Sequence, residues 1–150
     1  MDAVERKIIS ELLLDGRLTL TELSERIGLS LSSCHRRVKA LEESGAIRGY
    51  RADVDASRVG LKFTAIVFVT LKNGDRASIK IFEDEIQTIP EITKAQRLFG
   101  DPDYLLQIVT WDLESFQALY DRKLSALAGV QRLTSTIVMK NVVQDRILPL

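Results

Sequence analysis

The amino-acid sequence predicts an α+β protein with a helical N-terminal part and a C-terminal part in which strands and helices alternate. Two observations predict this arrangement. Before about residue 45, apolar residues recur every three or four positions in three stretches, which is the period of a helix. After about residue 61, short apolar runs and amphipathic stretches follow in the order strand, helix, strand, strand, helix, strand.

Composition limits the possible functions. The chain has 150 residues, 45% of them hydrophobic, which is enough for a core, and its 21 basic residues balance 21 acidic ones. The longest dense apolar run, residues 65–69, is too short to cross a bilayer, and the N-terminus has no apolar leader, so we expect a soluble, cytoplasmic protein. The single Cys excludes an intrachain disulfide, and the single His argues against the usual zinc sites and a Ser-His-Asp triad. We expect no metal, cofactor or catalytic residue.

Three helices are predicted in the first 45 residues. Asp2 with Glu5 and Thr19 with Glu22 have the spacing of capping boxes. The residues expected to cap the N-terminal ends are Asp2, Thr19 and Ser30. The glycines expected to end the helices are Gly16, Gly28 and Gly45. The apolar stripe of the third helix, predicted to point inward, is Leu31, Cys34, Val38 and Leu41.

The second and third helices are predicted to form a helix-turn-helix, because only about three residues separate them. In such a motif the second helix enters the DNA major groove. The candidate DNA contacts on or beside its outward face are Ser30, Ser32, Ser33, Arg36, Arg37 and Lys39. Residues 31–60 carry six basic and four acidic residues, whereas residues 1–30 carry four basic and six acidic ones. This difference in charge favours DNA binding by the outward face of the third helix. An ordinary amphipathic helix would also place cations outward, and contacts with another protein are an alternative use.

From Ala46 the polarity alternates through Tyr50, Ala52 and Val54, as in a half-exposed strand, and residues 55–62 are interpreted as a connection between domains. Strands are then predicted over 62–72, on both sides of the loop at 98–106, and over 133–143. The intervening helices are predicted to carry two apolar stripes. The stripe of the first helix, which Pro90 ends, is Ile79, Phe82, Ile86 and Ile89. The stripe of the second helix, which Asp112 caps, is Leu113, Phe116, Tyr120, Leu124 and Leu127.

The order βαββαβ is the ferredoxin-like arrangement, with both helices on one face of an antiparallel sheet. Residues 62–72 are apolar on both faces of the predicted strand. The second face therefore needs a cover, and we expect a dimer formed sheet to sheet.

Over almost its whole length the chain resembles the Lrp/AsnC family, the leucine-responsive or feast/famine transcriptional regulators. The stretches that carry the resemblance are DAVERKIISELLLDGRLTLTELSERIGLS, RVKALEESGAIRGY, GDPDYLL and TSTIVM. The resemblance implies a winged helix-turn-helix with its linker strand over residues 1–60 and a ferredoxin-like effector-binding and oligomerisation domain over residues 61–150. It also implies a regulator of double-stranded DNA that forms homodimers, which often assemble into octamers. Its oligomeric state or DNA affinity is expected to respond to an amino acid or related small metabolite.

The resemblance places the loop in LFGDPDYLL, residues 98–106, at an effector pocket between subunits. An aspartate would accept hydrogen bonds from an α-ammonium group, backbone N–H and threonine hydroxyl groups would bind the carboxylate, and the tyrosine would close the wall. The expected contacts are Gly100, Asp101, Asp103, Tyr104, Thr134 and Thr136. Two alternatives stay open: a self-capping turn that only fixes the hairpin, and an enzyme that uses the two aspartates as an acid–base pair.

Overall fold

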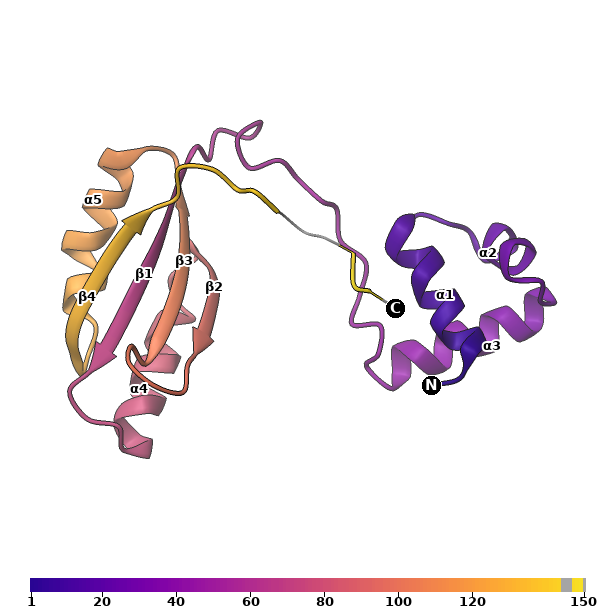
Figure 1. The fold of residues 1–150 in the computed structure, drawn as a ribbon, viewed down its shortest axis with the longest axis horizontal. Helices are drawn as coiled ribbons and strands as arrows, with labels where there is room; N and C mark the ends of the chain where they lie inside the picture. Colours follow the sequence, from indigo (N-terminus) through magenta and orange to yellow (C-terminus); the bar gives the residue numbers. More distant parts are fainter. Residues whose placement is uncertain (144–146, 150) are drawn as a thin grey trace. The chain divides into compact units, whose positions relative to one another are not determined.

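The computed structural model describes residues 1–143 and 147–149 and divides into two compact units (Figure 1). One unit is Met1–Asp53 together with the last residues from Val143, and the other is Val54–Val142. No helix among the described residues is long and apolar enough to cross a membrane.

The N-terminal unit contains the three predicted helices, α1 (Ala3–Leu14), α2 (Leu20–Ile27) and α3 (Leu31–Glu43) (Figure 1). Both predicted capping boxes are present, and all three predicted N-cap side chains accept a hydrogen bond from their own first turn. These caps satisfy backbone N–H groups that the helix itself leaves without partners. The helices pack around one buried cluster, Ile8, Leu23, Ile27, Cys34, Val38 and Leu41.

Two details of these helices differ from the prediction. Asp15, and not Gly16, is the C-cap of α1, because its N–H donates to the Glu11 carbonyl (2.9 Å) and its carboxylate accepts the Arg17 N–H (2.9 Å). Leu31, predicted to point inward, is 51% exposed. As the first residue of α3 it lies on the flank of the buried stripe, and the buried cluster includes α3 only from Cys34 onward.

The predicted half-exposed strand that follows α3 is wrong, because residues 48–55 form no strand. A strand requires a hydrogen-bonded neighbour, and the described part of this unit offers none. Tyr50 instead donates its hydroxyl to the Glu42 carboxylate of α3 (3.0 Å), while Val54 is 56% exposed. The alternating polarity therefore belongs to an irregular connecting segment.

The second unit has the predicted ferredoxin-like order of elements. An antiparallel sheet in the order β2-β3-β1-β4 is formed by β1 (Phe63–Leu71), β2 (Ile92–Arg97), β3 (Tyr104–Thr110) and β4 (Val130–Ile137). The helices α4 (Arg76–Ile86) and α5 (Leu113–Arg122) pack on the sheet through one shared core (Figure 1). Within that core, Phe82 of α4 and Phe116 of α5 contact the buried side of the strands.

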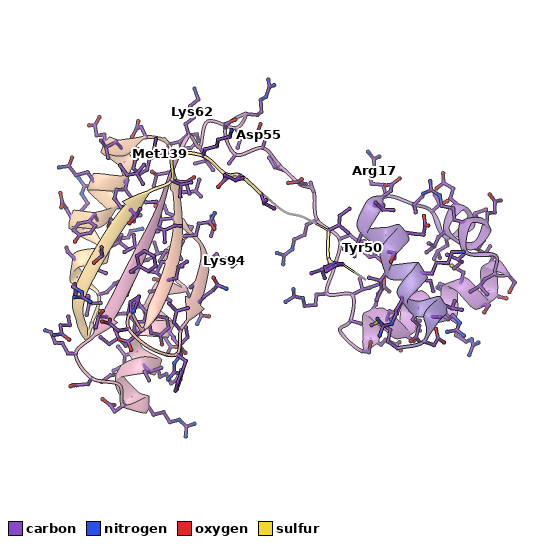
Figure 2. The ribbon with its side chains drawn as sticks, viewed as in Figure 1. Arg17, Tyr50, Asp55, Lys62, Lys94 and Met139 are labelled. Carbon is purple, nitrogen blue, oxygen red and sulfur yellow. The ribbon has the colours of Figure 1, made fainter. Side chains whose placement is uncertain are left out.

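The two faces of the sheet differ in burial. In β1 fully buried residues alternate with half-buried ones, because Val67 and Val69 face the helices while Ile66 and Phe68 face the other way. The half-buried apolar residues of this second side, called the open face below, are Ile66, Phe68, Leu105 and Val109. Its polar rim includes Lys94, labelled on β2 in Figure 2 and paired with Gln107. None of the helices in the described part of this unit covers the open face.

Two predicted boundaries also shift. The last strand is Val130–Ile137 rather than 133–143, because its pairing with β1 runs out near the start of β1, at the pair Ala65 and Ile137. The helix after Asp112 ends at Arg122, and Leu124, although fully buried as predicted, belongs to the 3₁₀ turn η1 (Leu124–Ala126).

The chain enters the second unit through a turn that packs on Trp111. Gly60 has φ +93°, and a Cβ built on it would lie 2.6 Å from Cζ3 of Trp111. Next to this contact, the Lys62 N–H donates to the Trp111 carbonyl (3.3 Å). Both the backbone conformation and the close approach therefore require glycine.

Gly60→Ala is expected to destabilise the second unit by about 1 to 3 kcal/mol, through left-handed backbone strain and overpacking on Trp111. Denaturant unfolding followed by tryptophan fluorescence measures the change. Gly74→Ala is the matched control, since Gly74 lies outside the left-handed region and its added Cβ would meet nothing within 4 Å. Equal stability of the two variants would contradict the assigned role of Gly60.

Candidate functional site

The turn between α2 and α3 fixes the start of the predicted recognition helix. Gly28 adopts the left-handed conformation (φ 74°) that ends α2, and the Leu29 N–H donates back to the Ser24 carbonyl (3.0 Å). Ser30 then caps α3 by accepting the Ser33 N–H (3.3 Å). The direction of α3 therefore depends on local hydrogen bonds and on the cluster beneath it.

The outward face of α3 presents small polar and cationic side chains. Ser32 and Arg36 are exposed, and within the described part of the chain Arg36 has no ion pair or hydrogen bond. Lys39 is 3.6 Å from Glu43, but their side chains are 64% and 68% exposed, and such pairs contribute little stability. Both cations are thus free to contact an external anion.

Arg37 has a different environment from Arg36. Its Nη1 lies 2.6 Å from the Asp2 carboxylate and 3.9 Å from that of Glu5, at the start of α1. Its side chain is only 28% exposed, and its Nε is enclosed without a hydrogen-bond partner among the described residues. The Glu5 N–H and the Arg37 guanidinium lower the pKa of Asp2, so this carboxylate is charged at neutral pH. Arg37 therefore ties α3 to α1.

The loop between β2 and β3 is held by backbone hydrogen bonds. The Leu98 N–H donates to the Asp103 carbonyl (2.7 Å), and the Asp103 N–H donates to the Val69 carbonyl of β1 (2.9 Å). Gly100 has φ 134°, a conformation that other residues rarely adopt, and it is exposed. The loop is consequently anchored to two strands.

The two aspartates of this loop have different partners. The Asp103 carboxylate accepts the Leu71 N–H (2.7 Å) and thereby ties the loop to the end of β1. Asp101 is 72% exposed and accepts weaker hydrogen bonds from the Thr70 hydroxyl (3.2 Å) and the Arg132 guanidinium (3.4 Å). Asp101 is therefore the carboxylate that is available to a ligand.

Tyr104 is placed differently from the prediction that it closes the wall of an effector pocket. It is 2% exposed, packs on Phe82 (ring centroids 4.7 Å apart) and donates its hydroxyl to Glu83 (2.7 Å). Burial and the hydrogen bond to Glu83 raise its pKa to about 12. Because alternate residues of a strand face opposite sides, it lies on the helix side while Thr134 and Thr136 lie on the open face. The expectation that these three side chains share one site is wrong.

Thr134 and Thr136 are exposed on β4, where they pair with Phe68 and Ile66 of the open face. Two positions before Thr134, and on the same face, Arg132 pairs with Thr70. The Arg132 guanidinium and the Thr70 hydroxyl thus meet the Asp101 carboxylate at one end of the open face.

Thr70 and Arg132 were not predicted as site residues. Each lies 31 residues from Asp101 in the sequence. Only the register of β1 against β4 brings them together.

Comparison with known protein families identifies both units. Residues 1–48 match the family described as a winged helix-turn-helix DNA-binding domain, and residues 64–148 match the Lrp/AsnC ligand binding domain.

Similar proteins cover nearly the whole chain. The leucine-responsive regulatory protein of Rhizobium meliloti is 39% identical over 95% of this chain and 91% of its own length. The Bkd operon transcriptional regulator of Pseudomonas aeruginosa is 33% identical over 100% of this chain and 98% of its own.

Solved structures of similar proteins share the fold. A transcriptional regulator of Neisseria meningitidis in complex with L-Met has a TM-score of 0.92 and 34% identity, covering 99% of this chain and 96% of that one. An AsnC family transcriptional regulator of Agrobacterium tumefaciens has a TM-score of 0.92 and 31% identity, covering 99% and 97%. These matches remove the enzyme alternative for Asp101 and Asp103. The chain belongs to the Lrp/AsnC family of transcriptional regulators, in which a winged helix-turn-helix DNA-binding domain is joined to a ligand-binding domain.

Proposed function

We propose that this regulator reads double-stranded DNA through α3 and changes its oligomeric state or DNA affinity when an amino acid or related metabolite binds near Asp101. The observation that carries the DNA half of the proposal is the free cationic face of α3. Residues 1–60 are the proposed DNA-binding part with its linker, and residues 61–150 the effector-binding and oligomerisation part. The cytoplasm, where such a regulator meets its DNA, is the proposed compartment.

On the DNA side, the small Ser32 lets the helix approach the groove closely, and Arg36 can donate two hydrogen bonds to a guanine. Lys39 suits a phosphate contact, since its ammonium is a flexible point charge. The serines at the start of α3 lie where the helix N-terminus itself favours a phosphate. Arg37 is reassigned from DNA contact to support of α3, because its guanidinium is engaged with α1.

On the effector side, the pairing of Asp101 with Arg132 supports an amino-acid ligand. The carboxylate can accept hydrogen bonds from an α-ammonium group, and the guanidinium can bind an α-carboxylate through two parallel hydrogen bonds. The direct contact between the two is long (3.4 Å) and exposed, so a zwitterion can replace it at little cost. Gly100 and the Thr134 and Thr136 hydroxyls complete the proposed contacts. The L-Met complex of the Neisseria meningitidis regulator supports this ligand class.

The proposed assembly is a homodimer formed through the open face, with octamers built from dimers. The apolar side chains of this face gain stability when a second copy covers them. A two-fold dimer would also present two α3 helices to DNA, so the proposed operator is a near-palindrome with half-sites about one helical turn, or a multiple of it, apart.

Arg36→Ala is expected to weaken binding to a selected operator by about 1 to 3 kcal/mol and to relax its sequence preference, without changing the melting temperature. Lys39→Ala should mainly reduce the slope of affinity against salt. Fluorescence anisotropy over a salt series measures both effects.

Arg37→Ala is the matched control, because it removes the same side chain one position along α3. It should lower the melting temperature of the N-terminal unit, since Asp2 and Glu5 lose their partner. Unchanged DNA affinity in both the Arg36 and Lys39 variants would refute this assignment of the face.

Asp101→Asn is expected to abolish or strongly weaken amino-acid binding in calorimetry against the common amino acids, at an unchanged melting temperature. Asp103→Asn separates the roles of the two aspartates. The substitution replaces the charged carboxylate that accepts the Leu71 N–H by a neutral amide, which is a weaker acceptor. This variant should therefore lower the melting temperature. Wild-type protein that binds none of the amino acids, or binding indifferent to Asp101→Asn, would leave the loop as a turn that only fixes the hairpin.

A further inference from the structure

Leu31 is a large apolar side chain on a surface that is otherwise polar. It is the first residue of α3, it lies between the two exposed serines Ser30 and Ser32, and it is 51% exposed. The buried cluster beneath α3 starts three residues later, at Cys34, so Leu31 contributes little to that core. Its position at the start of α3 therefore leaves an apolar side chain exposed beside the outward face of that helix.

The surroundings of Leu31 form a shallow depression of about 660 Å³ between the first turns of α2 and α3. The residues that line it are Leu20, Thr21, Leu31, Ser32 and His35. No Lys, Arg, Asp or Glu is among them. Two leucines within a polar rim instead suit a small apolar group.

The depression lies beside the face that reads DNA. At about 100° per residue, Leu31 and His35 share one flank of α3, next to Ser32 and Arg36 on the outward side. In the major groove the thymine C5-methyl is the apolar group that a base edge presents. A leucine at the N-terminal end of a recognition helix is therefore matched to a thymine.

We propose that Leu31 is a specificity-determining residue that contacts the C5-methyl of a thymine at one fixed position of each half-site. The inference rests on the proposed entry of α3 into the major groove and adds a base preference to it. Arg36 favours guanine through hydrogen bonds, whereas Leu31 favours thymine through burial of a methyl group.

The test replaces single thymines by uracil in an operator selected from random-sequence DNA with the full-length wild-type protein. Uracil keeps the base pairing and lacks only the methyl group. At one position of each half-site the wild type should lose about fourfold in affinity, the factor expected for burial of one methyl group. Leu31→Ala should bind the thymine and uracil operators equally, at an unchanged melting temperature, because Leu31 is exposed and alanine favours helix.

Leu113→Ala is the matched control. Leu113 lies in the other unit, where it is the first residue of α5 and follows the N-cap Asp112, and it is 57% exposed. This variant should keep the wild-type discrimination between thymine and uracil. The proposal is overturned if no thymine is methyl-sensitive or if Leu31→Ala keeps the sensitivity. A wild-type protein that selects no DNA at all would refute the proposed function, and this inference with it.

Discussion

The second unit has a sheet with helices on one side only, and both the proposed assembly and the proposed effector site depend on this constraint. Val67, Val69 and their neighbours are buried beneath α4 and α5, whereas Ile66 and Phe68 on the opposite side are only partly buried. A contiguous apolar patch of this kind has a free-energy reason to meet another surface. A second copy of the chain offers a matching surface by symmetry.

The position of the proposed effector site links ligand binding to this face. Thr70, which donates to Asp101, lies two residues from Phe68 on the same side of β1, and Arg132 is its neighbour on β4. A ligand that rearranges Asp101 and Arg132 therefore acts at the end of the proposed interface. Thermodynamic linkage then requires that a change in assembly on ligand binding be matched by a change in ligand affinity on assembly. DNA binding by paired α3 helices would respond through the same equilibrium.

Much of the fold could be predicted from local sequence signals. The capping boxes at Asp2 and Thr19, the left-handed glycine at Gly28 and the alternation of helical and strand periods were sufficient for α1 to α3 and for the order of strands and helices along the second unit. The errors arose where the outcome depends on distant partners. The segment 48–55 has the alternating polarity of a strand, but the described residues of its unit include no strand with which it could pair. The strand β4 ends where its pairing with β1 ends. Leu31 fits the apolar stripe by sequence, but as the first residue of α3 it lies at the edge of the buried cluster and is exposed.

The same distinction applies to the candidate sites. The helix period placed Arg36 outward, but it could not show that Arg37 pairs with Asp2, 35 residues away. Because alternate residues of β3 face opposite sides of the sheet, Tyr104 lies on the helix side and not on the open face. Its place in the loop motif nevertheless suggested that it shares a site with Asp101. The pairing of Arg132 with Thr70 needed the register of the sheet.

Sedimentation velocity of the full-length protein at micromolar concentration, with and without Phe68→Glu, tests the proposed sheet-to-sheet assembly. We expect a dimer or larger assembly for the wild type and a folded monomer for the variant, with the fold checked by circular dichroism. Leu113→Glu, a similar change at an exposed position of α5, should leave the wild-type assembly intact. A monomeric wild type, or a Phe68→Glu protein that assembles like the wild type, would refute assembly through the open face.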